Sequence, residues 1–301
     1  MGRIAVIGSN MMDLVTYVNR MPRPGETLEA PSFEMGHGGK GANQAVAAAK
    51  LGADVMMLTK VGDDAFADAT IKNLAAAGVD TRHVTRVPGR SSGVAPIMVD
   101  PRGENSILIV KGANNDLKPA DIEAAADDLK ACDLILLQLE IPVETVYAAI
   151  AFGKRHGVET LLNPAPALLD LDIGRVRDAT FVVPNETELA ILSGRPVETV
   201  EQITQAAHSL IASGVGAVIV TMGARGALLV TFDATTQIAP VRATPIDTTG
   251  AGDAFIGCFA RYYVAGDSVE TALGKAARYA ADSITRRGTQ RAYATEAEFN
   301  R

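Results

Sequence analysis

Cysteine is scarce in this sequence: the 301 residues contain only Cys132 and Cys258, which lie far apart in apolar surroundings. Two such residues provide neither a disulfide framework nor the spacing of a metal site, which fits a reducing compartment. Long apolar runs are also missing, since no stretch approaches the ~20 residues of a membrane span. No signal-peptide pattern precedes the first predicted strand. We therefore expect a soluble, cytoplasmic protein.

An excess of basic residues is absent as well. Lys and Arg number 28 against 35 Asp and Glu, a formal net charge of −7, which argues against a nucleic-acid or anionic-membrane surface. Histidine is rare, and because the four residues do not cluster, His37 is interpreted as a loop residue rather than a metal ligand. Hydrophobic residues make up 48% and charged residues 21% of the chain, so disorder is excluded and a large core is available.

Short apolar runs alternate with alanine-rich helical patterns along the chain. We predict strands at residues 3–8, 55–62, 134–140, 159–165, 180–185 and 217–223, and helices near 41–53, 63–77, 119–130, 142–156, 199–213, 250–265 and 268–286. The alternation predicts an α/β fold with a doubly wound, mostly parallel sheet flanked by helices.

Segments 14–36 and 92–113 break this alternation, because neither has a helical period. We interpret both as antiparallel strands of a small β-lid inserted into the α/β body. In the second segment, Asp100-Pro101-Arg102-Gly103 supplies turn residues between two apolar runs. We predict a single catalytic domain over residues 1–301 that carries this lid.

The strongest chemical signal is the motif DTTGAGD, from Asp247 to Asp253. Gly250 and Gly252 let the backbone approach a ligand, and the amides at 250–253 begin a predicted helix, which favours a phosphate or a developing negative charge. Asp253, at the start of that helix, is positioned to accept a proton from an attacking hydroxyl. The alternative is that Asp253 only caps the helix.

A second glycine-rich loop, GHGGKGAN at residues 36–43, leads into an earlier helix and lacks the Walker A spacing. Backbone packed close to a polyhydroxylated ligand would explain its glycines, and Lys40 and Asn43 could then donate to hydroxyl groups. A plain tight turn is the alternative. Glu140 ends a predicted strand at the edge where ligands bind in such sheets, unless it is a solvated strand-end charge.

Two further segments are compatible with phosphate chemistry. Asn185 and Glu188 have the spacing of a capping box, and Glu188 could in addition be an outer-shell partner of a phosphate-bound Mg²⁺. The segment from Thr221 to Gly226, TMGARG, lies between two apolar runs. It is either a hairpin turn or the rim of a nucleotide-phosphate site, and spacing alone does not decide between them.

These motifs, in this order along essentially the whole chain, resemble the ribokinase family of PfkB-type carbohydrate kinases. The resemblance is carried by GGKGANQ, NPAP, PNETE, the TMGxxG turn and DTTGAGDAF. It implies a ribokinase-like fold and an ATP-dependent kinase, in which Asp253 deprotonates the primary 5-hydroxyl of a pentose for attack on the γ-phosphate. A Rossmann dehydrogenase is excluded because GSNMMD follows the first strand instead of GxGxxG. A regulator without catalysis would not need Asp253 and the glycine pair, and both are present.

The resemblance also implies roles for individual residues. Sugar contacts would come from Asp13, Gly39, Lys40, Asn43, Glu140 and Asp253. Nucleotide contacts would come from Asn185, Thr221, Gly223, Gly226, Gly250, Ala251 and Gly252. Among these, the amides of Ala251 and Gly252 would form an anion hole. Glu188 would be associated with Mg²⁺, and an activating K⁺ would be held by Asp247, Thr249, Ser283, Arg286 and Gly288. Family members pair such lids, so we expect a homodimer.

Three positions depart from the family's pattern. Ala292 replaces a serine ligand of the K⁺ site, so Tyr293 or water would have to substitute for it, and Ala277 replaces a histidine near the adenine. Met11 stands where ribokinases, which read GSxNxD, have an Asn facing the sugar hydroxyls.

Met11 and Asp13 are two residues apart and share one face of the predicted strand, whereas Asn10 points to the other face. A thioether offers a hydroxyl no useful partner but packs well against a CH₂ group. We therefore predict 2-deoxy-D-ribose as the substrate, with D-ribose as the alternative. The alternative for Met11 itself is that it fills core space.

Overall fold

The computed structural model describes residues 2–102 and 104–301. Its main sheet has nine strands in the order β13-β12-β11-β10-β9-β8-β1-β4-β5. All neighbouring pairs from β11 to β5 are parallel, and only β12 and β13 are added antiparallel. The strands are β1 (Arg3–Ile7), β4 (Asp54–Val61), β5 (Val84–Arg86), β8 (Leu134–Gln138), β9 (Glu159–Asn163), β10 (Phe181–Val182), β11 (Ala217–Thr221), β12 (Ala227–Val230) and β13 (Thr235–Ile238). The predicted mostly parallel sheet is confirmed.

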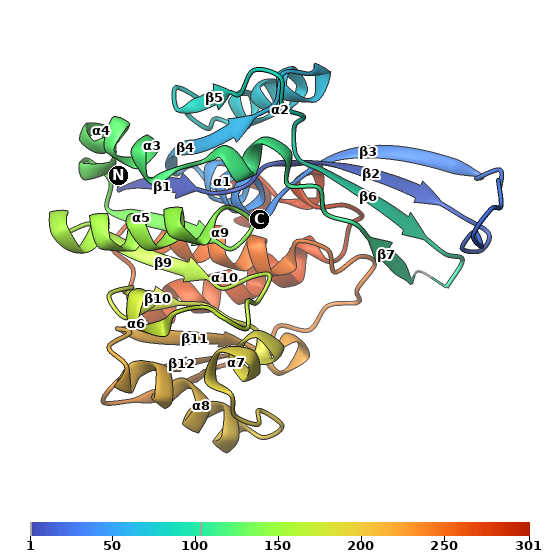
Figure 1. Ribbon diagram of the computed structural model, residues 1–301. Helices are drawn as coiled ribbons and strands as arrows, with labels where there is room; N and C mark the ends of the chain where they lie inside the picture. Colours follow the sequence, from blue (N-terminus) through green and yellow to red (C-terminus); the bar gives the residue numbers. More distant parts are fainter. Residues whose placement is uncertain (1, 103) are drawn as a thin grey trace.

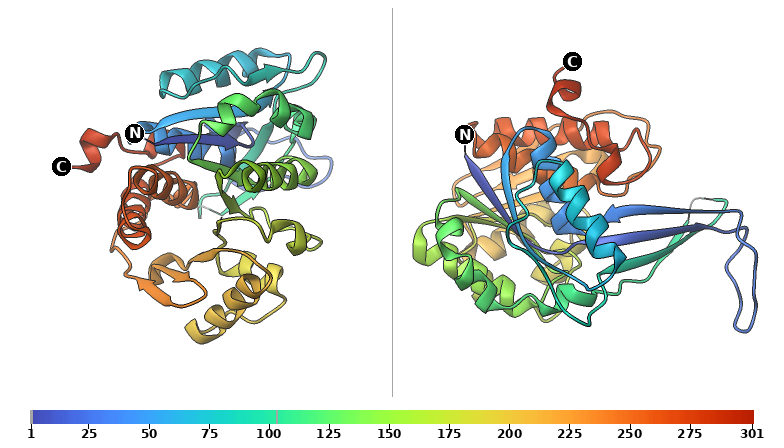
Figure 2. Two further views of the ribbon diagram at one scale, coloured as in Figure 1. Left: turned by 90° about the vertical axis from the view of Figure 1, so that its left-hand side faces the viewer. Right: turned by 90° about the horizontal axis from the view of Figure 1, so that it is seen from above.

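Helices cover both faces of the sheet (Figures 1 and 2). One face carries α1 (Lys40–Lys50), α2 (Ala65–Ala76), α9 (Ala251–Tyr263), α10 (Val269–Ser283) and the short α11 (Glu296–Phe299). The other carries α3 (Pro119–Ala124), α4 (Ala126–Lys130), α5 (Val143–His156), α6 (Ile173–Val176), α7 (Glu186–Ser193) and α8 (Val200–Ala212).

The apolar strands are buried on both faces because successive side chains point to opposite sides. Within β1, Ile4 and Val6 pack under α1 and α9, while Ala5 and Ile7 pack into the core cluster on the opposite face. Two strand or helix predictions needed adjustment. The helix predicted at 119–130 is divided at Ala125 into α3 and α4, and the strand predicted at 180–185 is shortened to two residues before Pro184, which has no N–H to donate.

A four-stranded lid in the order β3-β2-β6-β7 projects from the body (Figures 1 and 2). Its strands are β2 (Met11–Tyr17), β3 (Ser32–Gly38), β6 (Val94–Val99) and β7 (Asn105–Ile107). The predicted lid therefore exists, but its first strand begins at Met11 and not at residue 14. The β6–β7 turn is closed by Asp100 N, which donates to Glu104 O, and Gly103 of the predicted turn lies outside the described residues.

The lid is not wholly antiparallel, so that part of the prediction was wrong. The outer pairs β2–β3 and β6–β7 are antiparallel, but the central pair β2–β6 is parallel. The reason is topological: β2 and β6 begin two separate excursions that leave the same edge of the body and run outward in the same direction.

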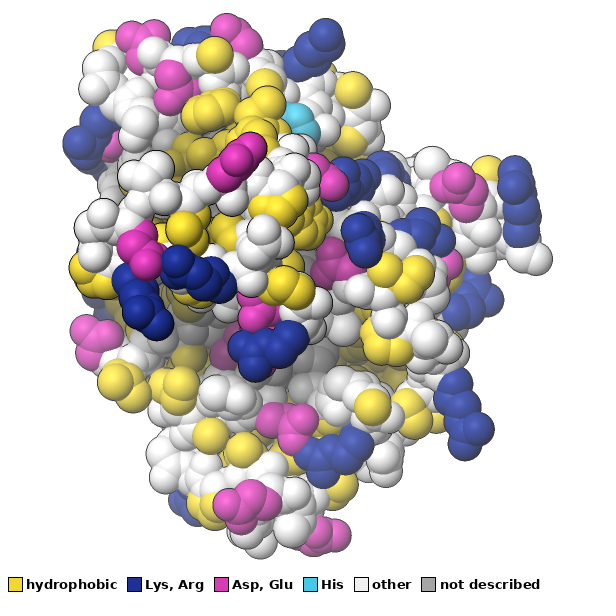
Figure 3. Space-filling model, turned by 90° about the vertical axis from the view of Figure 1, so that its right-hand side faces the viewer, with side chains coloured by type: hydrophobic (Ala, Val, Ile, Leu, Met, Phe, Trp, Pro, Cys, Tyr) yellow, Lys and Arg dark blue, Asp and Glu magenta, His cyan; other side chains and the backbone are white. Residues whose placement is uncertain are grey.

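Apolar side chains remain exposed on and beside the lid: Phe33, Met35, Ile107, Leu108, Ile109 and Val110 are each at least 47% exposed. The face from which the lid projects shows hydrophobic side chains at the surface among charged ones (Figure 3). Across residues 2–102 and 104–301, no helix combines the length and apolarity needed to cross a membrane.

Candidate active site

The polar residues singled out from the sequence meet at the carboxyl edge of the parallel strands. The loop after β1, the end of β8 and the N-termini of α1 and α9 converge there, as expected for a doubly wound sheet. Lys40 N donates to Glu140 Oε2 at 2.9 Å, and Asn43 Nδ2 donates to Asp253 Oδ2 at 2.9 Å. The first bond joins residues separated by 100 positions in the chain, and the second joins residues separated by 210 positions.

Asp253 lies in the first turn of α9 and is only 6% exposed. Its two oxygens accept hydrogen bonds from α1: Asn43 Nδ2 at 2.9 Å and Gln44 Nε2 at 3.0 Å. The helix begins at Gly250, and no side chain caps it. The carboxylate is therefore bound by side chains of α1 and not by the amides of its own helix, which favours the proton-accepting interpretation over the capping one.

The carboxylates of Asp13, Glu140 and Asp253 lie close enough at this edge to interact electrostatically, and Lys40 lies near the last two. Burial, then the negative charges of Glu140 and Asp253, raise the pKa of Asp13 to about 7. Burial works against the charged form of Lys40, but the surrounding carboxylates, led by Asp253 and Glu140, outweigh it and raise the pKa of Lys40. The cradle is therefore rich in hydrogen-bond acceptors, which suits a neutral ligand that carries several hydroxyl donors better than an anion.

The raised pKa of Asp13 makes a prediction about stability. A carboxyl whose pKa rises from 3.8 unfolded to about 7 folded favours folding below pH 4, and this contribution is lost as the pH rises through 7. The stability of Asp13→Asn relative to the wild type should therefore increase by roughly 2–4 kcal/mol between pH 4 and pH 8, with the change complete near pH 7. Thermal unfolding of both proteins from pH 4 to pH 8 measures the difference in stability, and a constant difference over that range would contradict the prediction.

Two glycines of the loop at 36–41, Gly39 and Gly41, are explained by packing against protein backbone and not by the approach of a ligand. Gly39 has φ 86°, and a Cβ there would lie 2.7 Å from the Cα of Asn10; a Cβ on Gly41 would lie 2.7 Å from the N of Ser9. A Cβ on Gly38 would collide with the carboxylate of Asp13. These glycines let the loop lie directly on the β1–β2 connection, where Ala42 N donates to Ser9 O at 2.8 Å at the start of α1.

The second glycine-rich edge follows β10 and β11. Asn185 and Glu188 form both bonds of a capping box at the start of α7, each 2.8 Å long, which confirms the capping interpretation. Burial raises the pKa of Glu188, partly offset by its bond to the Asn185 amide. The segment from Thr221 to Gly226 connects two antiparallel strands, and Gly226 has φ 87° where any Cβ would strike the carbonyl of Ile238. The segment is therefore a hairpin turn, and a contact of this turn with a nucleotide is a separate question.

Three of the residues predicted to hold a monovalent cation, Asp247, Thr249 and Gly288, are bonded to one another. Asp247 N donates to Ile284 O at 3.2 Å, and Gly288 N donates to Asp247 Oδ2 at 2.8 Å, so the segment before α9 lies against the segment after α10. Burial disfavours the charged Asp247, but hydrogen bonds from Thr249 and Gly288 outweigh it and lower the pKa of Asp247.

Tyr293 serves a different purpose from the one suggested by its place beside Ala292. Its hydroxyl donates to Gly250 O at 2.9 Å, and burial raises the pKa of this phenol well above its usual range. The Ala292 carbonyl meanwhile accepts from Arg286 Nε at 2.9 Å. Tyr293 therefore supports the glycine loop that begins α9.

Several polar residues around Asp253 were missed by the sequence analysis. Ser9 Oγ donates to Glu140 Oε2 at 2.5 Å, and Gln138 Nε2 donates to Gln44 Oε1 at 2.7 Å. The signal that could have found them is an amide placed inside an otherwise apolar run, as in AVAAAK after Gln44 and in LILLQ. The buried polar residues of this group are Ser9, Gln44, Gln138, Asn163 and Gln290.

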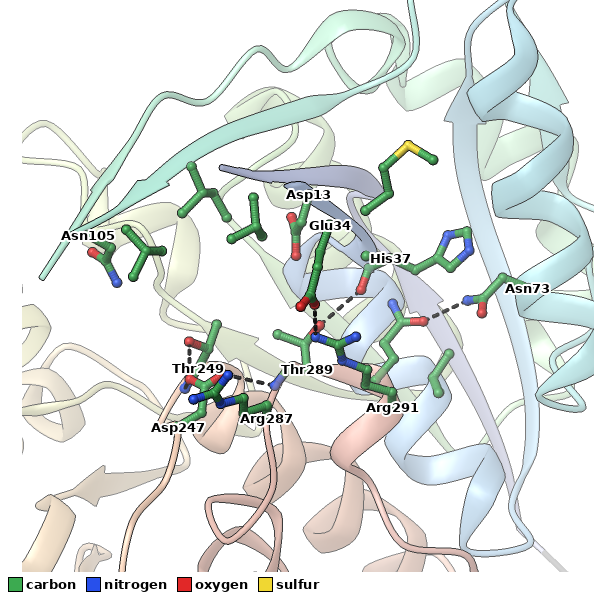
Figure 4. A pocket seen from close by; sticks show the side chains of 18 of the residues that line it. Asp13, Glu34, His37, Asn73, Asn105, Asp247, Thr249, Arg287, Thr289 and Arg291 are labelled. Carbon is green, nitrogen blue, oxygen red and sulfur yellow. Dashed lines mark hydrogen bonds and ion pairs between the residues drawn. The ribbon is translucent and has the colours of Figure 1, made fainter. Parts of the chain in front are cut away.

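A cavity of about 560 Å³ lies between the lid and residues 287–291 (Figure 4). Asp13 lines it from β2, and Asp247 and Thr249 from the opposite side. Two bonds cross from the C-terminal segment to β3: Thr289 Oγ1 donates to His37 O at 3.0 Å, and Arg291 pairs with Glu34 at 2.7 Å. Among the described residues, the buried Nδ1 of His37 has no hydrogen-bond partner.

A doubly wound sheet with a lid, a buried carboxylate at a helix N-terminus and an acceptor-rich cradle defines an α/β kinase for a small polyhydroxylated acceptor. The model of the pfkB family carbohydrate kinases matches residues 1–296, and the chain belongs to this family. It is an ATP-dependent sugar kinase.

Known relatives are similar over almost their whole length. The deoxyribokinase of Salmonella typhi is 59% identical over 297 residues, which cover 99% of this chain and 97% of the relative. The ribokinase of Bacillus subtilis is 41% identical over 290 residues, or 96% of this chain and 95% of the relative.

Solved structures agree with the fold. The ribokinase of Arabidopsis thaliana, complexed with ribose and ATP, superposes with a TM-score of 0.93 at 32% identity, covering 99% of this chain and 97% of that one. The ribokinase of Thermotoga maritima gives a TM-score of 0.92 at 34% identity and covers 100% and 98%. The predicted ribokinase-like fold is confirmed.

Proposed function

We propose that this kinase phosphorylates the 5-hydroxyl of 2-deoxy-D-ribose with ATP, with D-ribose as a slower substrate. The observation that carries the proposal is Met11, which is 3% exposed on the same face of β2 as Asp13. The similarity to deoxyribokinase supports it. Asn10 cannot supply the missing amide, because its Nδ2 donates to Thr59 Oγ1 and Lys60 O, both at 2.8 Å, on the far side of the strand.

In the proposed mechanism, Asp13, Lys40 and Asn43 hold the sugar hydroxyls, with Glu140 fixing the Lys40 amide. Asp253 accepts the proton of the 5-hydroxyl as its oxygen attacks the γ-phosphate. The amides of Ala251 and Gly252, at the positive end of α9, stabilise the charge that develops on the transferred group. The second glycine-rich edge would contact the nucleotide through Asn185, Thr221, Gly223 and Gly226.

A coupled assay of ADP release with ribose, 2-deoxyribose, fructose and adenosine tests the proposed substrate. We expect the highest kcat/KM with 2-deoxyribose and a value about 10–100-fold lower with ribose. A preference for ribose would reassign the specificity without affecting the kinase class.

The donor set fits the two metal ions that the family implies. Glu188 has one oxygen committed to its capping bond, which leaves the other for a water of Mg²⁺, an ion that typically keeps several waters. Oxygen ligands from Asp247, Thr249, Ser283, Arg286 and Gly288, mainly backbone carbonyls, suit K⁺. Bound there, K⁺ would supply positive charge that holds the segment before α9 in place, and Mg²⁺ would neutralise phosphate charge.

Activity should be higher in K⁺ than in Na⁺, and Asp247→Asn should remove most of this difference. The reason is that the carboxylate is the only full negative charge we assign to the cation site. Initial rates in matched chloride salts of K⁺, Na⁺ and tetramethylammonium measure the effect, with Asp233→Asn, an exposed carboxylate in the β12–β13 turn, as control. Equal rates in all three salts would contradict the assignment.

We further propose that the chain acts as one catalytic domain and forms a homodimer through the lid. The exposed apolar residues of β3 and of residues 107–110 support this, because an uncovered apolar sheet favours association. Light scattering at micromolar concentration should give twice the chain mass of 31.4 kDa, and Phe33→Asp should lower it. A monomeric mass for the wild type would refute the dimer.

A further inference from the structure

A chain of side-chain amides leads from α2 to the carboxylate of Asp253. Asn73 Nδ2 donates to Gln290 Oε1 at 2.7 Å, Gln290 Nε2 donates to Asn43 Oδ1 at 3.0 Å, and Asn43 Nδ2 donates to Asp253 Oδ2 at 2.9 Å. The first of these bonds is drawn at Asn73 in Figure 4. Asn43 and Gln290 are only 5% and 6% exposed, so water does not replace these bonds.

The carboxylate of Asp253, at one end of this series of hydrogen bonds, fixes the direction of every bond in it. An ionised carboxylate accepts hydrogen bonds and donates none, so Asn43 must turn its NH₂ group towards Asp253. Its carbonyl oxygen then faces Gln290 and needs a donor, which orients the Gln290 amide, and the same argument orients Asn73. Reversing any link would place two oxygens against each other in a buried site, at a cost well above that of a missing exposed bond.

Residue 290 is itself held firmly. Lys50 Nζ donates to the main-chain oxygen of Gln290 at 2.8 Å and to that of Tyr293 at 2.9 Å. Thr289 and Arg291, on either side, are bound to strand β3 of the lid. The amide of Gln290 is thus presented to Asn43 from a segment with anchors on α1 and on the lid.

We propose that Gln290 is a positioning residue for phosphoryl transfer. By holding the Asn43 carbonyl, it keeps the Asn43 NH₂ on Asp253, and together with Gln44 this fixes both carboxylate oxygens for the incoming hydroxyl. The inference rests on the proposed role of Asp253 as the base. Gln290 does not touch the reacting atoms and acts only through Asn43.

The test compares Gln290→Glu with Gln290→Leu. Glutamate has the size of glutamine and still accepts from Asn73, but when ionised it cannot donate to Asn43, so the Asn43 amide turns its oxygen towards Asp253. We expect Gln290→Glu to lower kcat about 10–100-fold at pH 8 and Gln290→Leu to lower it less, with KM for ATP unchanged in both. Gln205→Glu, on the exposed face of α8, is the matched control and should behave like the wild type.

The pH profile separates positioning from packing. A protonated glutamic acid regains a donor, so the ratio of Gln290→Glu to wild-type kcat should rise as the pH falls from 8 to 6, whereas the ratio for Gln290→Leu should stay constant. A packing role predicts the opposite order, with leucine worse than glutamate and both deficits independent of pH. That outcome would overturn the inference.

Asn73, at the half-buried end of the chain, provides a second pair of variants if Gln290→Glu does not fold. Asn73→Asp presents an acceptor to Gln290 and so reverses the direction of the hydrogen bonds in the series. It should lower kcat about 5–10-fold, while kcat of Asn73→Ala should stay within about 2-fold of the wild-type value. Equal activity of the two variants would overturn the inference.

Asp253→Asn distinguishes failure of the proposed function from failure of the positioning role. If Asp253→Asn retains activity, the proposed function fails. If it is inactive while Gln290→Glu is normal, only the positioning role of Gln290 fails.

Discussion

Asp253→Asn should lower kcat by at least ~10² while leaving the affinities for sugar and ATP nearly intact. Asparagine matches the carboxylate in size but cannot accept the proton of the 5-hydroxyl. Its NH₂ group would also face one of the two donors that now bind the carboxylate, Asn43 Nδ2 or Gln44 Nε2. One of these amides must then turn, which adds to the loss of the base.

Calorimetric titration with the sugar, and separately with a non-hydrolysable ATP analogue, measures binding, and a coupled assay measures kcat. Asp233→Asn, an exposed carboxylate in a turn, controls for the chemical change. Wild-type kcat in Asp253→Asn would refute the base assignment, and loss of sugar binding together with activity would indicate that the residue serves binding alone.

Met11→Asn should move the specificity from 2-deoxyribose towards ribose. Beside C2 of the sugar, the thioether leaves a 2-hydroxyl without a partner, which costs about 1–3 kcal/mol, and an amide at the same place restores that partner. The ratio of kcat/KM for the two sugars should change by roughly 10–100-fold. Gly38 lies opposite Met11 in the β2–β3 register, and the carboxylate of Asp13 packs directly against it.

The neighbouring residue provides the matched control. Met12 is also buried, at 4% exposed, but points to the other face of β2. Met12→Asn makes the same chemical change there, so it should lower stability without altering the sugar ratio. Met11 and Met12 are both buried outside the two apolar core clusters of the described chain, so the two substitutions differ in the face of β2 that they change. A ratio unchanged in Met11→Asn would establish a pure packing role for Met11 and remove the basis for the deoxyribose proposal.

The sequence by itself determined the α/β class, the mostly parallel sheet and the existence of a lid. Apolar runs such as LILLQ and alanine-rich helices report local burial directly, because a strand covered on both faces has nowhere to place polar side chains. The motifs around Lys40 and Asp253 could also be read, since glycines next to a helix start are a local signal.

What the sequence could not decide depends on contacts between distant segments. The parallel pairing of β2 with β6 joins residues about 80 positions apart, and no local pattern specifies the relative direction of two strands. The sequence pattern of glycines 39 and 41 indicates the approach of a ligand, because the backbone that lies on them, at Ser9 and Asn10, is remote from them in the chain.

The same reason explains why Gln290 was overlooked. An isolated glutamine in a polar C-terminal segment carries no signal of its own, and its meaning arises only when the fold places it between Asn73 and Asn43. Hydrogen-bond direction in a buried chain is set by its terminal acceptor, here Asp253, which lies 37 residues away in sequence but is two bonds away in space. Local patterning thus determined which residues are inside, and tertiary structure alone decided which of those polar residues act together.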